Sequence, residues 1–370
     1  MSTTTEAPSA VRATRPTVSN RTNLVTAVLG MWLTVGLMLD AWAHNTVPDL
    51  ESFFTPWHGV FYTGFFATAA WIAWTVRGPL FDRRFAEIPV GYGAAVVAVG
   101  VFALSAAGDM SWHIAFGIEQ NIDILFSPTH LGLGAAMVVI LLAPVRSAWA
   151  ARPAGAPGLG RLFPAILSTA LAATVTLLFL QYGNVLTFTS GDVAVGLSNL
   201  DEGHTARLVT AMALTNLVLL LPVLGLARRW TLPFGTTTIV YAMTALLSAA
   251  ISDFENAELM IGVVAAGVGV DLVAQWLRPG PGRLVAFRLF AAAAPLVTWT
   301  VFIVTAYLTS PPLFNPDGRT EAIPEIYTGA PIVQALLGLL AGILLIPARE
   351  RAAVAGPARG LAGSASDAGG

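Results

Sequence analysis

Long apolar segments recur along the whole chain, and they constrain its fold more than any other feature. About ten of them approach the roughly 20 residues that a helix needs to cross a bilayer. Only 11% of the 370 residues are charged and 55% are hydrophobic, a balance typical of a membrane protein. We therefore predict an all-α, polytopic transmembrane helical bundle of about ten spans, at residues 24–44, 57–76, 88–108, 130–150, 162–182, 207–227, 235–252, 256–277, 284–308 and 328–347.

The distribution of arginine indicates how these spans are oriented in the membrane. Arginine is the only basic residue type, because none of the 19 Lys and Arg positions is lysine. Arginines precede the first predicted span and follow the even-numbered ones, with Arg207 and Arg319 as exceptions. By the positive-inside rule both termini are cytoplasmic. We expect a multi-pass protein of the bacterial plasma (inner) membrane, surrounded by the lipid bilayer.

Composition divides the chain into five parts. Residues 1–22 and 351–370, rich in small and polar residues, are predicted to be disordered tails. The Gly- and Pro-rich segment 151–161 is predicted to be a cytoplasmic linker. On either side of this linker we expect a four-helix metal-binding membrane unit (23–150) and a six-helix membrane unit without an assigned role (162–350).

A polar motif occurs twice, at the external ends of predicted helices. In each copy an Asp precedes a His by four residues, and a Phe-[Thr/Ser]-Pro-x-His string ends in a second His. Positions i and i+4 share a helix face, and a hydroxyl residue before Pro favours a helix start. The motif is therefore an internal repeat of a helical hairpin, and each copy is predicted to gather a triad. The triads are Asp40, His44 and His58, and Asp109, His113 and His130.

A carboxylate with two imidazoles is a donor set that suits Cu(II), Zn or Fe. The chain has no cysteine, so thiolate sites are excluded. Glu51, Glu119 and Asp123 are candidates to orient the imidazoles by hydrogen bonds. Two interpretations without metal stay open: the Asp–His pairs satisfy each other structurally, or they form a proton relay or ligand sensor. Neighbouring aromatics, including Trp57 and Tyr62, are predicted to pack at the membrane interface.

At these residues the sequence resembles the C subunit of the copper membrane monooxygenases, the particulate methane and ammonia monooxygenase family. The resemblance covers about residues 24–150. It implies copper sites on two successive helical hairpins, at the two triads, and additional membrane or extracytoplasmic subunits as partners. The family has Asn where this sequence has Asp109, so the second triad departs from the family's pattern.

We therefore expect an integral membrane metal-binding protein, with copper favoured over zinc or iron. The favoured function is an oxygenase-type oxidoreductase, or a subunit of one, acting on a small apolar substrate, with Asp109, His113 and His130 as the catalytic residues. The alternative is external copper or other metal acquisition, or transport, without redox catalysis. A net charge of −2 and the absence of a phosphate-binding loop predict no nucleic-acid or nucleotide partner.

The back half offers weaker candidates. His204 is predicted to lie in a solvated external loop, with an accessory metal ligand as the alternative. The acidic segment 252–258 is predicted to be either a plain polar turn or a cover over the metal region. Asp271 lies seven residues before Arg278, and pairing with that residue is the simplest expectation.

Overall fold

The computed structural model describes residues 15–47, 55–117, 121–151, 155–198, 202–310 and 322–346, with only the backbone for 121–123. Every regular element within these residues is a helix, which confirms the all-α prediction. The α-helices are α1 (Asn20–Thr46), α2 (Pro56–Phe81), α3 (Tyr92–Phe116), α4 (Pro128–Leu141), α5 (Ala143–Ala150), α6 (Leu159–Phe179), α7 (Ser190–Gly196), α8 (Glu202–Arg229), α9 (Thr236–Ala250), α10 (Ala257–Leu277), α11 (Leu284–Thr309) and α12 (Pro324–Leu345). Four 3-10 helices are η1 (Phe85–Glu87), η2 (Asn121–Phe126), η3 (Gln181–Gly183) and η4 (Val185–Thr187).

Nine helices in the described part of the chain are long and apolar enough to cross a membrane, with α4 and α5 counted as one span. The remaining predicted span is α9, an apolar helix of 15 residues. At the usual helical rise it is about 22 Å long, shorter than a hydrocarbon core of about 30 Å. The polytopic membrane architecture is thus confirmed, and the orientation of the termini stays a prediction.

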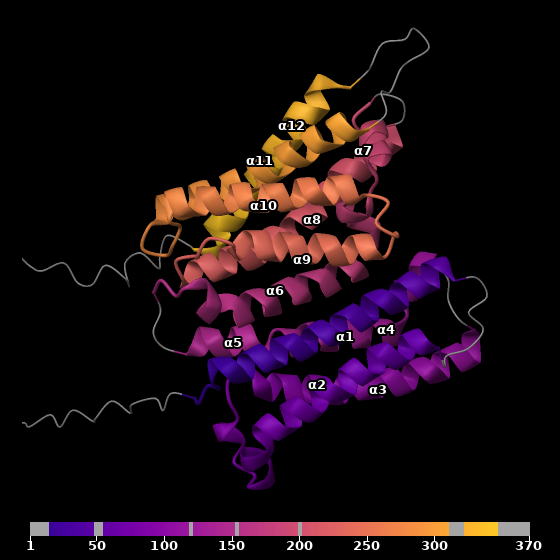
Figure 1. The fold of residues 1–370 in the computed structure, drawn as a ribbon, viewed down its shortest axis with the longest axis vertical. Helices are drawn as coiled ribbons and strands as arrows, with labels where there is room; N and C mark the ends of the chain where they lie inside the picture. The colour runs from indigo at the N-terminus through magenta and orange to yellow at the C-terminus, as the bar shows by residue number, and fades with distance from the viewer. Residues whose placement is uncertain are drawn as a thin grey trace, which may run out of the picture.

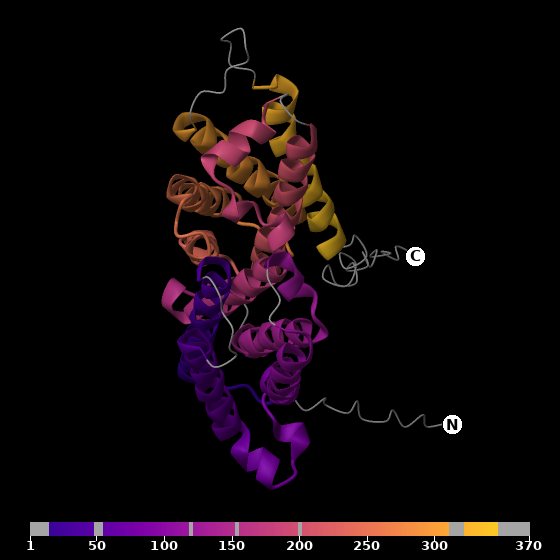
Figure 2. The ribbon, with the colours of Figure 1, turned by 90° about the vertical axis from the view of Figure 1, so that its right-hand side faces the viewer.

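The helices form two units stacked along the longest axis of the molecule, as Figures 1 and 2 show. In the N-terminal unit α1 packs along α2 and α3 packs along α4, while in the C-terminal unit α10 packs between α9 and α11. Helix α6 contacts α1 and α4 on one side and α8 and α9 on the other. It is also the most enclosed span, with 83% of its most apolar stretch buried. The two units therefore share α6 as a common wall.

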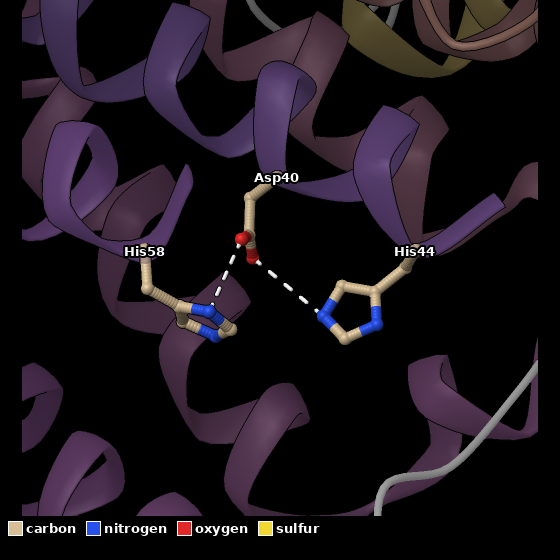
Figure 3. A group of neighbouring side chains, drawn as sticks. All are labelled: Asp40, His44 and His58. Carbon is tan, nitrogen blue, oxygen red and sulfur yellow. Dashed lines mark ion pairs between the residues drawn. The ribbon is translucent and has the colours of Figure 1, made fainter. Parts of the chain in front are cut away.

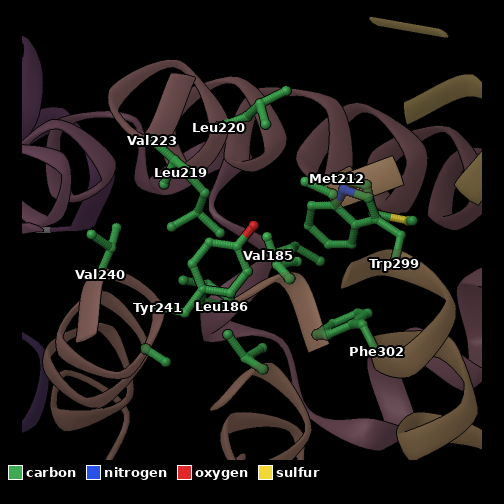
Figure 4. Packing of buried hydrophobic residues seen from close by; sticks show 14 of the residues in the cluster. Val185, Leu186, Met212, Leu219, Leu220, Val223, Val240, Tyr241, Trp299 and Phe302 are labelled. Carbon is green, nitrogen blue, oxygen red and sulfur yellow. The ribbon is translucent and has the colours of Figure 1, made fainter. Parts of the chain in front are cut away.

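A core rich in aromatic side chains fixes the C-terminal unit (Figure 4). Trp299 and Phe302 meet edge to face with ring centroids 5.5 Å apart. The Tyr241 hydroxyl lies 3.1 Å from the Thr298 hydroxyl, so the phenol is buried with a hydrogen-bond partner. The Tyr241–Thr298 contact thus links the side chains of α9 and α11 within this core.

Asp271 has a different role from the expected pairing with Arg278. Its carboxylate accepts hydrogen bonds from the backbone N–H groups of Gly235, Thr237 and Thr238, at 3.0, 2.9 and 3.0 Å. The Thr238 hydroxyl also donates to it, at 2.7 Å. These N–H groups belong to the start of α9, where a negative charge is favourable. The buried carboxylate therefore fixes the N-terminus of α9.

Candidate metal centre

Helix ends place the histidines of both triads. The Thr55 side chain accepts a hydrogen bond from the N–H of His58 at 3.1 Å, and the Ser127 side chain accepts from the N–H of His130 at 3.2 Å. Each hydroxyl is the N-cap of its helix, α2 or α4, with Pro as the first helical residue, as predicted from the sequence. At the end of α3, Gly117 adopts a positive φ of 84° and stops the helix four residues after His113.

Glycines allow α1 and α2 to approach closely. A Cβ added at Gly36 would lie 2.7 Å from the Cα of Phe61, and one added at Gly64 would lie 2.9 Å from the Cα of Leu33. Side chains at these positions would push the helices apart. The close approach brings the end of α1, with Asp40 and His44, to the start of α2.

Asp40 lies between two imidazoles in the first triad (Figure 3). Its Oδ2 is 4.0 Å from Nε2 of His44, and its Oδ1 is 3.4 Å from Nδ1 of His58. The two rings are nearly perpendicular, with centroids 5.8 Å apart. Asp40 and His58 are each only 8% exposed. One ligand atom from each residue lies within 4.8 Å of the other two, so the triad could hold a metal ion.

The second triad repeats this arrangement on α3 and α4. Oδ2 of Asp109 is 3.4 Å from Nε2 of His113, and Oδ1 is 3.1 Å from Nδ1 of His130. Asp109 is 1% exposed. One ligand atom from each residue of this triad also lies within 4.8 Å of the other two. The structure thus brings together both predicted triads, each from two helices of one hairpin.

The two triads differ in how the carboxylate is held. In the second triad the Thr129 hydroxyl donates a 2.8 Å hydrogen bond to Oδ1 of Asp109. The equivalent position of the first motif, one residue before its final His, is Trp57. The indole of Trp57 does not take the place of this hydroxyl, and Oδ1 of Asp40 is buried without a hydrogen bond to any described residue. The first triad therefore keeps a buried carboxylate oxygen that a cation would satisfy.

The two triads are electrostatically coupled. Asp40 lies close enough to Asp109 and His113 for charge interactions, and His58 interacts in the same way with His113 and His130. Two buried carboxylates near each other are unfavourable in a membrane protein unless positive charge offsets them. Protonated imidazoles or bound metal ions would supply that charge.

An apolar cavity of about 490 Å³, open to the outside of the helix bundle, borders the first triad between α2 and α3. His58 and Tyr62 line its polar end, and Phe65, Phe66 and Met110 line its apolar part. The Tyr62 ring stacks on the His58 imidazole with centroids 6.0 Å apart. The cavity is thus large enough for a small organic molecule and has a candidate metal ligand in its wall.

Tyr62 is a site residue that sequence reasoning missed. The sequence predicts that it packs at the membrane interface, whereas it lies against His58 and in the cavity wall. The available signal was its position four residues after His58, on the same helix face. His204 lies in the first turn of α8 and belongs to neither triad. Three predicted orienting residues lie outside what the structure describes, namely Glu51, Glu119 and the side chain of Asp123.

The donor chemistry of the triads fits a divalent transition metal. Each offers one carboxylate oxygen and two imidazole nitrogens, and three protein ligands leave a coordination position for another molecule. Two ligand atoms held tetrahedrally at metal bonds of about 2.0–2.2 Å lie roughly 3.4 Å apart, so the separations of 3.1 to 4.0 Å between carboxylate oxygens and imidazole nitrogens are compatible with a shared metal ion. At the first triad, a bound cation would also give Oδ1 of Asp40 the partner that it lacks.

No protein-family model matches the chain, and neither curated proteins nor solved structures give a significant match.

Proposed function

We propose that this protein is a membrane copper protein that acts as an oxygenase-type oxidoreductase, or as a subunit of one, on a small apolar substrate. The observation that carries the proposal is the shared position of His58. Its imidazole belongs to the buried Asp40 triad and also lines an apolar cavity of about 490 Å³. A metal site and a binding space for an apolar molecule thus meet at one side chain.

Copper is the proposed metal because of the donor set and the surroundings. Imidazoles with a carboxylate suit copper, zinc and iron, and copper(II) is the tightest binder of these divalent ions. The resemblance of residues 24–150 to the C subunit of the copper membrane monooxygenases agrees with this choice. Under this proposal the chain is a distant relative of that subunit, and further subunits are its partners.

Each residue group has a defined part in the proposed reaction. A bound copper would supply redox chemistry toward dioxygen. The triads hold the metal, and Asp40, His44 and His58 are the proposed catalytic set, because the cavity borders this triad and not the Asp109, His113 and His130 triad that the sequence favoured. The aromatic and aliphatic wall around Tyr62 and Phe65 orients the substrate and excludes water. In the overall reaction one oxygen atom enters a C–H or N–H bond of the substrate and the other leaves as water, with electrons and protons from an external reductant.

Metal acquisition without redox chemistry is the competing function, because both triads lie at helix ends on the same side of the bundle. The apolar cavity distinguishes the two functions. Acquisition needs only the triads, whereas oxygenation also needs a place for the substrate beside the metal.

The test starts with the full-length protein purified in a non-chelating detergent. Copper content and electron paramagnetic resonance (EPR) spectra are compared for wild type, His58→Ala, His130→Ala and the matched control His204→Ala. We expect one copper per triad, each lost with its own histidine, and an unchanged control. No copper in any preparation after copper is added back would overturn the proposal. Copper binding without reductant-dependent oxygen uptake, in the presence of small hydrocarbons or ammonia and of native membranes, would favour acquisition.

A further inference from the structure

The first triad lacks the direct support that the second one has. Thr129 fixes the Asp109 carboxylate with a 2.8 Å hydrogen bond, and Trp57 occupies the equivalent position beside Asp40. Trp57 does not make that bond, because Oδ1 of Asp40 has no hydrogen-bond partner among the described residues. Some other contact must set the orientation of the first triad if it is to be as well defined as the second.

Trp57 instead packs against another tryptophan. Its ring meets the ring of Trp42 edge to face, with centroids 5.7 Å apart and an interplanar angle of 85°. Trp42 lies in the last turns of α1, two residues after Asp40 and two before His44, and Trp57 directly precedes His58. The tryptophan pair thus links both helix ends that carry the first triad.

The tryptophan pair is held by the C-terminal unit. Nε1 of Trp42 donates a 2.7 Å hydrogen bond to Oδ1 of Asp253, a residue 211 positions away in the turn between α9 and α10. A groove of about 290 Å³ between α1 and this turn is lined by Met38, Trp42 and Phe254, among others, so the hydrogen bond crosses a loosely packed region. It is a specific contact between the two units beside the candidate metal centre.

The α9–α10 turn (residues 251–256) is itself fixed in place. Asp253 and Phe254 both have positive φ angles, 52° and 60°; Asp tolerates such an angle, whereas a bulky Phe adopts it only when its surroundings impose it. The N–H of Phe254 bonds to the carbonyl of Ala249 at 3.0 Å. Asn256 is fully buried and donates to the carbonyl of Leu186 at 2.6 Å. A turn held this way presents the Asp253 carboxylate at a defined position.

We propose that Asp253 is a positioning residue for the first triad. Acting through Trp42 and Trp57, it sets the relative placement of the α1 end and the α2 start. It thereby orients the first triad, as Thr129 orients the second triad by a direct hydrogen bond. This inference rests on the proposed metal site. It also gives the C-terminal unit a function: its external turn holds the metal centre of the N-terminal unit.

If the Trp42–Asp253 hydrogen bond only held the two units together, its removal would have a different effect. Loss of such a tie would lower overall stability and affect both triads equally. Loss of a positioning contact would change the first triad strongly and would reach the second only weakly, through the charge interactions between them. The test therefore reads each triad separately, with His130→Ala as the background for the first triad and His58→Ala as the background for the second.

Four variants are placed in each background. Asp253→Ala and Trp42→Phe remove the hydrogen bond from either side, and Trp42→Phe leaves the turn intact in case the alanine variant misfolds. Asp253→Asn keeps an acceptor oxygen and tolerates the positive φ, so it is the rescue variant. Glu255→Ala, an exposed change in the same turn, is the matched control. The measurements are copper affinity by competition titration and the EPR spectrum.

We expect Asp253→Ala and Trp42→Phe to weaken copper binding at the first triad by about 10–100-fold, the usual effect of losing an orienting contact, and to change its EPR spectrum. The second triad should change far less in affinity and spectrum, and Asp253→Asn and Glu255→Ala should resemble the unsubstituted backgrounds. Unchanged copper binding and spectra in Trp42→Phe would overturn the inference, as would equal losses at both triads.

A metal-free readout separates this inference from the proposed function. Nitrogen-15 NMR of labelled histidines reports the imidazole environments in metal-free protein. We expect Trp42→Phe to shift the resonances of His44 and His58 clearly more than those of His113 and His130. If the wild type binds no copper, the proposed function fails, and these spectra still decide whether Asp253 positions the first triad: unshifted His44 and His58 resonances would overturn the inference.

Discussion

Thr129 donates a 2.8 Å hydrogen bond to Asp109, whereas Trp57, its counterpart in the other repeat, leaves Oδ1 of Asp40 without a hydrogen bond. The two triads thus have the same ligands and different support. A carboxylate that is already hydrogen-bonded is better oriented, and one with an open buried oxygen gains more from a cation. The two sites are therefore expected to respond differently to mutation.

Removing the Thr129 hydroxyl should weaken the second site selectively. Thr129→Val keeps the side-chain shape and loses the donor to Asp109. We expect about a 10–100-fold loss of copper affinity at the second triad, measured by titration in the His58→Ala background, and no change at the first triad. Thr63→Val is the matched control, because the Thr63 hydroxyl bonds only to carbonyls of its own helix. Equal affinities for Thr129→Val and the control would contradict the prediction.

Neutralising Asp40 should have opposite effects with and without metal. In metal-free protein Asp40→Asn removes a buried charge close to Asp109, so the melting temperature should stay the same or rise. With copper at about 100 times its dissociation constant, an intact first site gains about 2.7 kcal/mol of stability, and the variant should gain none. Thermal denaturation in the His130→Ala background, with and without copper, measures both the change in melting temperature of the metal-free protein and the stabilisation by copper. A lower melting temperature of the variant without copper would show that Asp40 is structural.

The sequence was informative wherever the interactions are local. The triads depend on an i,i+4 spacing and on hydroxyl-Pro helix starts, so their assembly follows from short-range rules. The hydrogen bond between Trp42 and Asp253 joins residues 211 positions apart, and no local sequence pattern predicts it. Asp271 shows how spacing can mislead. Its distance from Arg278 suggested pairing, but Arg278 lies past the end of α10 with a positive φ of 48°, and the carboxylate turns to the start of α9.

Filling the apolar cavity should impair substrate binding without loss of metal. Ala106 lines the cavity from α3, and Ala106→Phe would occupy part of its 490 Å³. We expect unchanged copper content and a higher KM that rises most for the largest substrate in a series of small hydrocarbons. Ala70→Phe, an exposed change on α2, is the control. Equal KM values across the substrate series for the two variants would show that the cavity does not hold the substrate.

The Asp271 carboxylate should be important for stability and irrelevant to the metal. Asp271→Ala leaves three backbone N–H groups and the Thr238 hydroxyl without their acceptor, at a cost of about 1–3 kcal/mol for each buried donor that finds no water. We expect a clear fall in melting temperature in detergent and an unchanged copper content per folded molecule. Arg278→Asn, which tolerates the positive φ at that position, should leave the melting temperature unchanged. A large fall in the melting temperature of Arg278→Asn would instead support the pairing of Asp271 with Arg278 that the sequence predicts.

The orientation in the membrane can be tested directly because the chain has no cysteine of its own. Single cysteines at Glu87 and Glu255 place a thiol on exposed turns at opposite ends of the helices. If both termini are cytoplasmic, a membrane-impermeant maleimide added to intact cells should label Glu255→Cys and spare Glu87→Cys until the membrane is opened. The triads lie at the same helix ends as the α9–α10 turn, since Trp42 bonds to Asp253. Labelling of Glu255→Cys in intact cells would therefore place both metal sites at the extracytoplasmic face, and the reverse pattern would place them toward the cytoplasm.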